Sequence, residues 1–163
     1  MKQPNIVIVD YGVGNTCSIS NAIRALGYRK LKISGAEQDL LYADALILPG
    51  VGAFEACSKS LRDRHLDTIL HEAVLIRKIN VLGICVGMQL MATISEENGT
   101  HAGLDWIPGQ VVRLNLPENF AVPHVGWNDI RHRNEHILFS RTSKSPNFYF
   151  DHSYHYQCDE QFV

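Results

Sequence analysis

The stretch Val81-Leu82-Gly83-Ile84-Cys85-Val86-Gly87 places a cysteine between an apolar run and a segment with helical spacing. The run 81–84 predicts a strand buried on both faces, and residues 86–94 predict a helix. A sharp strand-to-helix turn holds a nucleophile in a strained, accessible conformation, and glycines on either side let the backbone close around it. We therefore expect Cys85 to be the nucleophile of a cysteine elbow. The alternative is a buried core cysteine that has glycine neighbours by chance.

The same alternation of strand and helix extends from this stretch to the N-terminus. Apolar runs predict strands at 6–9 and 45–48, a weaker strand is predicted at 31–34, and apolar spacing predicts helices at 16–26 and, in two pieces, 53–78. Such alternation is typical of an α/β fold with a mostly parallel sheet and helices on both faces. After Asn98 the pattern changes, and strands are predicted at 110–114, 125–130 and 148–156 without a long helix between them. We expect an antiparallel C-terminal half, and a single domain over residues 1–163.

A glycine-rich turn, Pro49-Gly50-Val51-Gly52, follows the predicted strand 45–48. An acyl-transfer enzyme needs N–H groups that stabilise the developing oxyanion, and a loop beside the elbow is a suitable place for one of them. A second such N–H is expected from Val86, at the start of the helix, whose dipole would also favour the thiolate of Cys85. An ordinary turn would explain the Pro-Gly pair alone, but the two loops together favour acyl transfer.

Composition excludes several classes of protein. The 163 residues are 45% hydrophobic and 20% charged, with 15 Lys and Arg against 17 Asp and Glu and a net charge of -2. This balance gives no electrostatic footprint for nucleic acid or for an anionic membrane. No apolar run approaches the roughly 20 residues of a membrane span, and the N-terminus does not resemble a signal peptide. The four scattered cysteines suit reduced thiols, so we expect a cytoplasmic protein.

Metal and nucleotide cofactors are not expected. His132 and His136, and likewise His152 and His155, have spacings that a metal could use, but no cysteine or carboxylate cluster joins them. The Gly12-Val13-Gly14 turn lacks the third glycine and the later acidic residue of a dinucleotide-binding loop.

Six segments that occur in order along nearly the whole chain carry a family resemblance. They are residues 10–15 (DYGVGN), 48–54 (LPGVGAF), 82–90 (LGICVGMQL), 95–97 (SEE), 123–128 (PHVGWN) and 148–154 (FYFDHSY). Together they resemble the glutamine amidotransferase subunits of imidazole glycerol phosphate synthase, a family of class I, triad-type amidotransferases of histidine biosynthesis. The elbow is shared by all class I amidotransferases, whereas the 123–128 and 148–154 segments are particular to this family and its close relatives.

The resemblance implies a flavodoxin-like class I amidotransferase fold and a glutaminase activity without a cofactor. Cys85 would attack the side-chain amide of L-glutamine, ammonia would leave, and a glutamyl thioester would be hydrolysed. The ammonia would pass to a synthase subunit with a (β/α)8-barrel fold. By position in the motifs, the residues implied are Val51 and Val86 for the oxyanion, Gly52, Gln89, Glu97, Ser153 and Tyr154 for glutamine, and Asn15 and Trp127 for the partner.

One departure from the family pattern concerns the base. A cysteine nucleophile of this type needs a histidine oriented by a carboxylate, which the family carries in a His-Pro-Glu segment that these 163 residues do not contain. We therefore expect the chain to lack the family's final strands and helix, with reduced solubility and turnover. His152 or His155 could replace the base, but their match to the 148–154 segment favours a structural role.

Three other functions remain open from the residues. One is a paralogous subunit that supplies ammonia for amino-sugar synthesis in surface polysaccharide. Another is a non-catalytic subunit that binds the synthase. The last is an unrelated redox or hydrolytic enzyme with a cysteine elbow.

Overall fold

Four short strands form a parallel sheet at the centre of the N-terminal half. The computed structural model describes residues 3–131, 139–140 and 146–163. The strands β1 (Ile6–Val9), β2 (Leu31–Ser34), β3 (Ala45–Leu48) and β4 (Asn80–Gly83) lie in the order β2-β1-β3-β4. The inner strands β1 and β3 are almost wholly buried, which explains why each is a continuous apolar run. The predicted parallel sheet is confirmed. The expectation that the strand before Cys85 is buried on both faces is wrong, because β4 lies at the end of the strand order and its Leu82 is 46% exposed.

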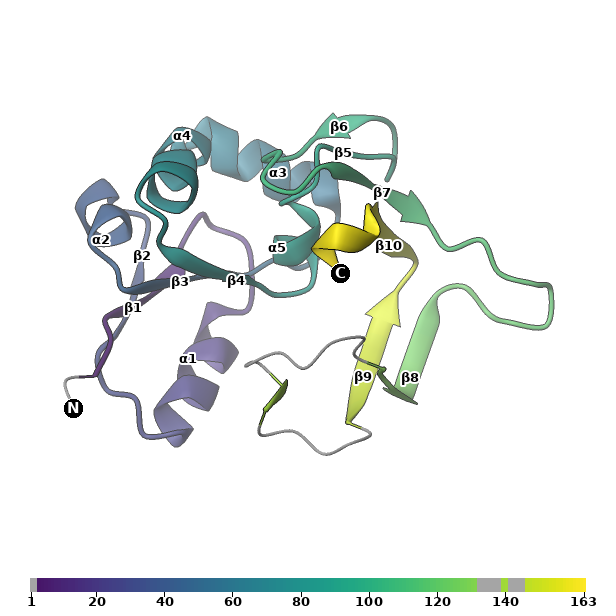
Figure 1. Ribbon diagram of the computed structural model, residues 1–163, viewed down its shortest axis with the longest axis horizontal. Helices are drawn as coiled ribbons and strands as arrows, with labels where there is room; N and C mark the ends of the chain where they lie inside the picture. The colour runs from purple at the N-terminus through teal and green to yellow at the C-terminus, as the bar shows by residue number, and fades with distance from the viewer. Residues whose placement is uncertain (1–2, 132–138, 141–145) are drawn as a thin grey trace.

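Helices cover both faces of this sheet (Figure 1). On one face lies α1 (Thr16–Ala25); on the other lie α2 (Glu37–Leu41), α3 (Phe54–Asp63), α4 (Leu66–His71) and a π-helical turn, η1 (Glu72–Ile76). Val9 and Leu48 from the strands join Phe54 and Leu70 from the helices in one buried core. The α/β class is therefore confirmed, and the helix expected at 53–78 is divided as predicted. Helix α2 was not predicted.

The C-terminal half contains a second sheet and a two-stranded ribbon. The sheet has the order β10-β7-β5-β6, built from β5 (Ile94–Ser95), β6 (His101–Ala102), β7 (Gly109–Arg113) and β10 (Tyr154–Cys158). The ribbon pairs β8 (His124–Asp129) with β9 (Asn147–His152), and a 3-10 turn, η3 (Glu160–Phe162), follows β10. All strand pairs here are antiparallel except β5 with β7, so the expected antiparallel half is largely confirmed.

The helix after Cys85 is much shorter than expected. It is α5 (Val86–Gln89), a single turn, whereas the apolar spacing predicted a helix to Ile94. The carbonyl of Leu90 accepts a hydrogen bond from the N–H of Leu104 at 2.7 Å, and the carbonyl of Met91 accepts one from Trp106 at 3.0 Å. Because these two carbonyls accept hydrogen bonds from the segment 104–106, they do not form the hydrogen bonds that would continue the helix. The close approach depends on Gly103, where a Cβ would lie 1.9 Å from the carbonyl oxygen of Ala92.

The strand expected at 148–156 is divided at Ser153. His152 pairs with His124 in the ribbon, whereas Tyr154 pairs with Arg113 in the second sheet. The carbonyl of Ser153 accepts a hydrogen bond of 2.9 Å from the N–H of Leu114. The chain therefore changes from one sheet to the other at Ser153.

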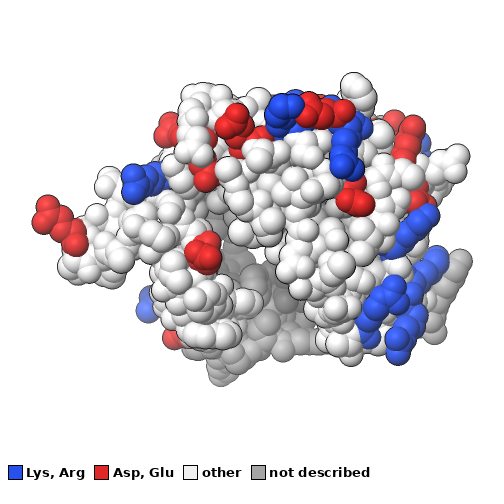
Figure 2. All heavy atoms as spheres, turned by 180° about the vertical axis from the view of Figure 1, so that it is seen from behind, with Lys and Arg blue, Asp and Glu red and all other residues white. Residues whose placement is uncertain are grey.

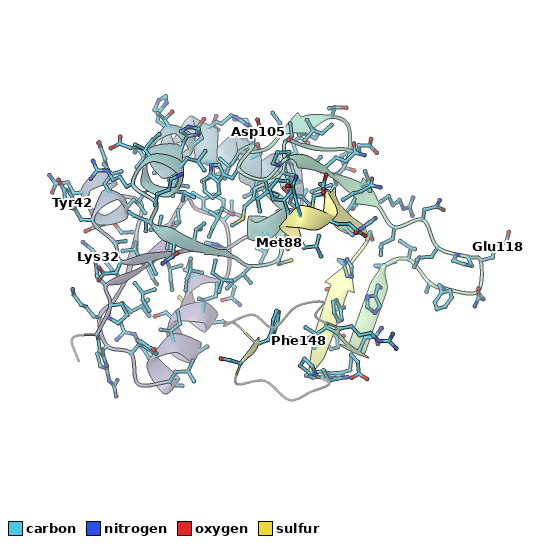
Figure 3. The ribbon with its side chains drawn as sticks, in the orientation of Figure 1. Lys32, Tyr42, Met88, Asp105, Glu118 and Phe148 are labelled. Carbon is cyan, nitrogen blue, oxygen red and sulfur yellow. The ribbon has the colours of Figure 1, made fainter. Side chains whose placement is uncertain are left out.

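Charged side chains are unevenly distributed over the side seen in Figure 2. Acidic and basic side chains alternate along the upper rim, and basic side chains gather at the end where Figure 1 places α1 and β2. The loop between β7 and β8 projects from the body, with Glu118 near its tip, and Phe148 lies on the ribbon (Figure 3). Among the described residues no helix has the length and apolar character needed to cross a bilayer. His132 and His136 lie outside the described residues.

Candidate active site

Cys85 lies at the sharp turn between β4 and α5. Its backbone has φ 55° and ψ -120°, a conformation that residues other than glycine rarely adopt. The side chain is exposed. Strain of this kind at an accessible thiol is the geometry expected of a nucleophile elbow. The alternative of a buried core cysteine is wrong, because the thiol is not in the core.

Glycines around the elbow are required by close backbone contacts. A Cβ on Gly87 would lie 1.9 Å from the carbonyl oxygen of Leu48, and one on Gly83 would lie 2.5 Å from the Cα of Met88. A Cβ on Gly50 would lie 2.3 Å from the backbone nitrogen of Gly87, so the glycine-rich loop touches the elbow directly. These contacts bring the end of β3 and the end of β4 together at one edge of the sheet.

The glycine-rich loop is held from inside the protein. The buried hydroxyl of Tyr11 donates a hydrogen bond to the carbonyl of Pro49, and the thiol of Cys57 donates one to the carbonyl of Val51 at 3.4 Å. Burial raises the pKa of both Tyr11 and Cys57, so both groups stay protonated and keep donating. The loop is therefore fixed against the elbow by two side chains that the sequence did not single out.

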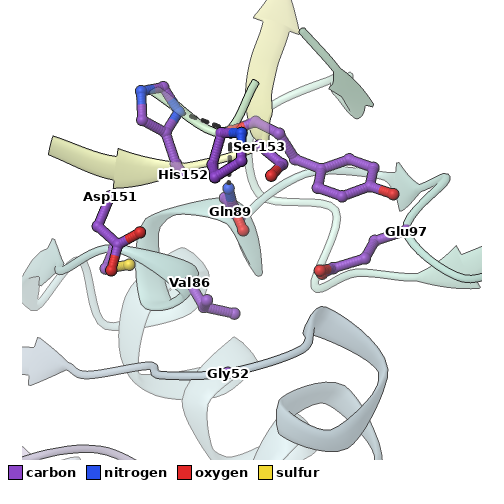
Figure 4. Close-up of a pocket in the computed structure, with 10 residues that line it drawn as sticks. Gly52, Val86, Gln89, Glu97, Asp151, His152 and Ser153 are labelled. Atoms are coloured by element: carbon purple, nitrogen blue, oxygen red, sulfur yellow. Dashed lines mark hydrogen bonds between the residues drawn. The ribbon is translucent and has the colours of Figure 1, made fainter. Parts of the chain in front are cut away.

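A pocket of about 450 Å³ opens beside Cys85 (Figure 4). This volume is typical of a site for a small molecule. The pocket contains most of the predicted site residues, from four separate segments: Gly52, Cys85, Val86, Gln89, Glu97, Ser153 and Tyr154. Val51 does not line it, and its side chain is exposed. Pro123, Asp151 and His152 complete the lining. Pro123 and Asp151 were not predicted as site residues, although both belong to the quoted segments 123–128 and 148–154.

The two long polar side chains expected to hold glutamine are themselves anchored. Gln89 is buried, and its Nε2 donates to the carbonyl of Tyr154 at 3.3 Å. Oε2 of Glu97 accepts a hydrogen bond from the backbone N–H of Phe54 at 2.8 Å. Both side chains therefore reach the pocket in fixed positions. A thiol, an amide and a carboxylate around one small hollow can bind an amino acid and attack its side chain.

His152 lines the pocket, but neither of its ring nitrogens is free. Its Nδ1 lies 3.0 Å from the carbonyl oxygen of Tyr154, and its Nε2 lies 3.1 Å from Nδ1 of His124. A general base for Cys85 needs an unoccupied ring nitrogen within reach of the thiol. The structural role favoured for this histidine therefore agrees with its contacts. Within the described part of the chain, no group of three His, Cys, Asp or Glu side chains could hold a metal ion.

The two residues expected at the partner interface lie outside the pocket. The side chain of Asn15 accepts a hydrogen bond of 3.2 Å from the N–H of Ser18 and begins α1. Trp127 on the ribbon is 72% exposed and packs edge to face against Tyr149, with 5.6 Å between ring centroids. An aromatic pair this exposed is suited to binding another protein.

Comparison with known proteins gives a consistent result. Residues 7–162 match the family model of class-I glutamine amidotransferases. The chain is 44% identical over 157 residues to imidazole glycerol phosphate synthase subunit HisH 2 of Vibrio vulnificus, an alignment that covers 96% of this chain and 73% of that protein. It is 40% identical to subunit HisH of Leptospira interrogans, covering 95% and 76%, and 39% identical to that of Archaeoglobus fulgidus, covering 97% and 76%.

A solved structure supports the fold independently. A crystal structure of a glutamine amidotransferase superposes with a TM-score of 0.70 at 17% identity, over 94% of this chain and 75% of that one. The chain therefore belongs to the class I glutamine amidotransferases and, within them, to the family of HisH subunits of imidazole glycerol phosphate synthase.

Proposed function

We propose that this chain is the glutaminase subunit of imidazole glycerol phosphate synthase, with Cys85 as the nucleophile. The thiolate attacks the side-chain carbonyl of L-glutamine, the nitrogen takes up a proton from water, and the C–N bond breaks so that the nitrogen leaves as ammonia. Water then hydrolyses the glutamyl thioester and releases glutamate. The N–H of Val86, the first residue of α5 and part of the pocket lining, stabilises the tetrahedral intermediates. Val51 does not line the pocket, so its N–H can take part only if the loop 49–52 moves toward Cys85.

One observation carries this proposal. Cys85, which is strained and exposed, lines the same pocket as Gln89, Glu97, Ser153 and Tyr154. Glu97 supplies a negative charge for the α-ammonium group of glutamine, and the backbone at Ser153 and Tyr154 lies where the carboxylate would bind. Family membership adds support, because the curated relatives are named as subunits of this synthase.

The partner in this proposal is the synthase subunit, a (β/α)8 barrel that uses the ammonia to make imidazole glycerol phosphate in histidine biosynthesis. Trp127 and Asn15 belong to the surface that would face it. Four free cysteines suit a reducing compartment, so we place the complex in the cytoplasm.

A second candidate function rests on the names of two relatives. The proteins of Vibrio vulnificus (44% identical) and Pseudomonas aeruginosa (42% identical) are both called HisH 2, which marks them as second copies. A second copy can serve another synthase, such as one that makes an amino sugar for surface polysaccharide. Copurification with the histidine-pathway synthase of the same organism, rather than with a polysaccharide synthase, supports the first function.

A glutamine-like chloroketone tests the site itself. It should alkylate Cys85 with saturation kinetics, and L-glutamine should protect the thiol, whereas D-glutamine and L-asparagine should not. Cys17 is the internal control, because it is also exposed but does not line the pocket. Labelling that does not saturate, or that D-glutamine slows equally, would show that this pocket does not recognise glutamine and would favour a non-catalytic subunit.

A further inference from the structure

Two histidine rings face each other where the ribbon meets the pocket. His124 and His152 are paired across β8 and β9, and Nδ1 of His124 lies 3.1 Å from Nε2 of His152. The His124 ring stacks on Phe150 with 4.8 Å between centroids. One of the two nitrogens must carry a proton and the other must accept it. The neighbouring groups decide which nitrogen does which.

Both ends of this contact are fixed by backbone groups whose roles cannot change. At one end, the N–H of Asp129 donates to Oδ1 of Asn128 at 2.9 Å, so the amide nitrogen of Asn128 faces Nε2 of His124 at 3.3 Å. At the other end, the carbonyl oxygen of Tyr154 can only accept, and Nδ1 of His152 lies 3.0 Å from it.

These constraints determine both tautomers. His152 must carry its proton on Nδ1, so in the neutral ring Nε2 accepts. His124 then donates from Nδ1, and its Nε2 accepts from Asn128. A neutral imidazole has one donor and one acceptor, and each ring uses both. The hydrogen bonds therefore all run in one direction, from Asp129 through Asn128, His124 and His152 to Tyr154.

The last acceptor in this series of hydrogen bonds, the carbonyl of Tyr154, belongs to a residue that lines the pocket. The carbonyl of Tyr154 also accepts a hydrogen bond of 3.3 Å from Nε2 of Gln89, and the dashed lines of Figure 4 converge there. His152, Gln89 and Tyr154 all line the pocket beside Cys85. Asn128, whose amide donates to His124, directly follows Trp127 on the ribbon. The hydrogen bonds thus connect the exposed ribbon to the residues expected to hold glutamine.

We propose that Asn128, His124 and His152 form a relay of hydrogen bonds that positions Tyr154 and Gln89 for glutamine, with His152 as the positioning residue. This inference rests on the proposed glutaminase function. It assigns His152 no part in proton transfer at Cys85, because both ring nitrogens are committed to the relay. Its contribution is to binding, since it fixes the carbonyl that orients Gln89.

Nitrogen-15 NMR of the histidine side chains in the purified chain tests the tautomers without any ligand. At neutral pH, Nδ1 should be protonated and Nε2 unprotonated in both His124 and His152. The substitution Asn128→Asp replaces a donor with an acceptor, so Nε2 of His124 should become protonated, whereas Asn128→Ala should not have this effect. Protonated Nε2 in either ring of the unsubstituted protein would overturn the relay.

Paired substitutions test the positioning role. Asparagine places an amide nitrogen near the position of Nδ1 of histidine, and glutamine places one near Nε2. His152→Asn can therefore keep the donor to Tyr154, whereas His152→Gln loses it. We expect the inhibition constant of the glutamine-like chloroketone to rise about three- to tenfold in His152→Gln, the range expected for one hydrogen bond, and less than about twofold in His152→Asn.

The same reasoning applies one step further from the pocket. His124→Ala removes the donor to His152 and should raise the inhibition constant about threefold, whereas His124→Asn keeps a donor and should restore it. His71→Gln, on the exposed end of α4, is the matched control and should change nothing. In every variant the maximal rate of Cys85 alkylation should stay unchanged, because positioning affects binding.

The outcomes separate this inference from the proposed function. If the unsubstituted chain shows no saturable, glutamine-protected labelling of Cys85, the proposed function fails. If that labelling is normal and the His152 and His124 variants all bind the chloroketone like the unsubstituted chain, the relay is wrong. A loss of binding in His152→Asn as large as that in His152→Gln, with unfolding transitions unchanged, would also reject it.

Discussion

Glu97 and Phe54 are joined by a hydrogen bond of 2.8 Å from the backbone N–H of Phe54 to Oε2 of Glu97. The first N–H groups of a helix have no partner within it, so this carboxylate satisfies one of them at the start of α3. The same side chain lines the pocket beside Cys85. Glu97 therefore fastens the loop after β5 to α3 and supplies charge to the site.

Substitution of Glu97 should separate these two roles. Glu97→Gln keeps an oxygen for the N–H of Phe54 but loses the charge, so the free energy of unfolding should change little while affinity for a glutamine analogue falls. Glu97→Ala loses both and should also destabilise the protein by about 1 kcal/mol. Urea unfolding and the inhibition constant of the chloroketone measure the two effects. Unchanged affinity in Glu97→Gln would mean that the carboxylate does not bind the ammonium group.

A methyl group at Gly87 should be far more damaging than one at a glycine in open space. In Gly87→Ala the new Cβ would lie 1.9 Å from the carbonyl oxygen of Leu48, so the elbow or β3 must move. We expect a loss of about 2 kcal/mol or more and much slower alkylation of Cys85. Gly27→Ala is the control: its φ of +89° is strained, but nothing lies within 4 Å, so it should cost about 1 kcal/mol and leave alkylation unchanged.

The cysteines should differ sharply in reactivity. Cys57 is buried and burial raises the pKa of its thiol, so it should react only when the protein unfolds. Cys85 and Cys17 are both exposed, and Cys17 also lies in the first turn of a helix, α1, so position at a helix start does not single out Cys85. A small reagent such as iodoacetamide should label both, and the chloroketone only Cys85. Mass spectrometry of the labelled peptides identifies which cysteine each reagent modifies. Chloroketone labelling mainly at Cys17 would contradict the assignment of Cys85 as the nucleophile.

Elements whose residues must meet a local requirement, such as burial of both faces of a strand, could be predicted from the sequence. The strands at 6–9 and 45–48 match β1 and β3, because strands buried on both faces are continuous apolar runs. The weaker strand expected at 31–34 matches β2, which is only partly buried. The elbow was recognisable because Gly83, Cys85 and Gly87 combine small size with a nucleophile. Such local requirements are visible in the residues themselves.

Features that depend on contacts between segments far apart in the chain could not be predicted from the sequence. Apolar spacing after Cys85 suited a helix to Ile94, but the Gly103–Trp106 segment takes the carbonyls of that stretch and ends the helix at Gln89. Likewise, the division of the last strand at Ser153 arises from pairing with two different sheets. The hold of Tyr11 and Cys57 on the glycine-rich loop and the relay through His124 are also contacts between distant residues, for which one sequence gives no periodic signal.

Trp127 should contribute to binding of the synthase subunit and not to the fold. Its ring is 72% exposed and contacts Tyr149 on the neighbouring strand, so its removal leaves no cavity in the core. A tryptophan that becomes buried at the centre of an interface commonly contributes about 2 kcal/mol or more, which corresponds to a loss of about thirtyfold in affinity. Trp127→Ala should therefore weaken the complex by at least that factor, measured by calorimetric titration with the purified synthase subunit. Its unfolding midpoint in urea should stay close to that of the unsubstituted chain. Tyr42→Ala is the matched control, because Tyr42 is 73% exposed and directly follows α2, and it should leave the affinity unchanged. Equal affinity of Trp127→Ala and Tyr42→Ala would place the interface elsewhere, and a large stability loss in Trp127→Ala would show that the ring belongs to the packing of the ribbon.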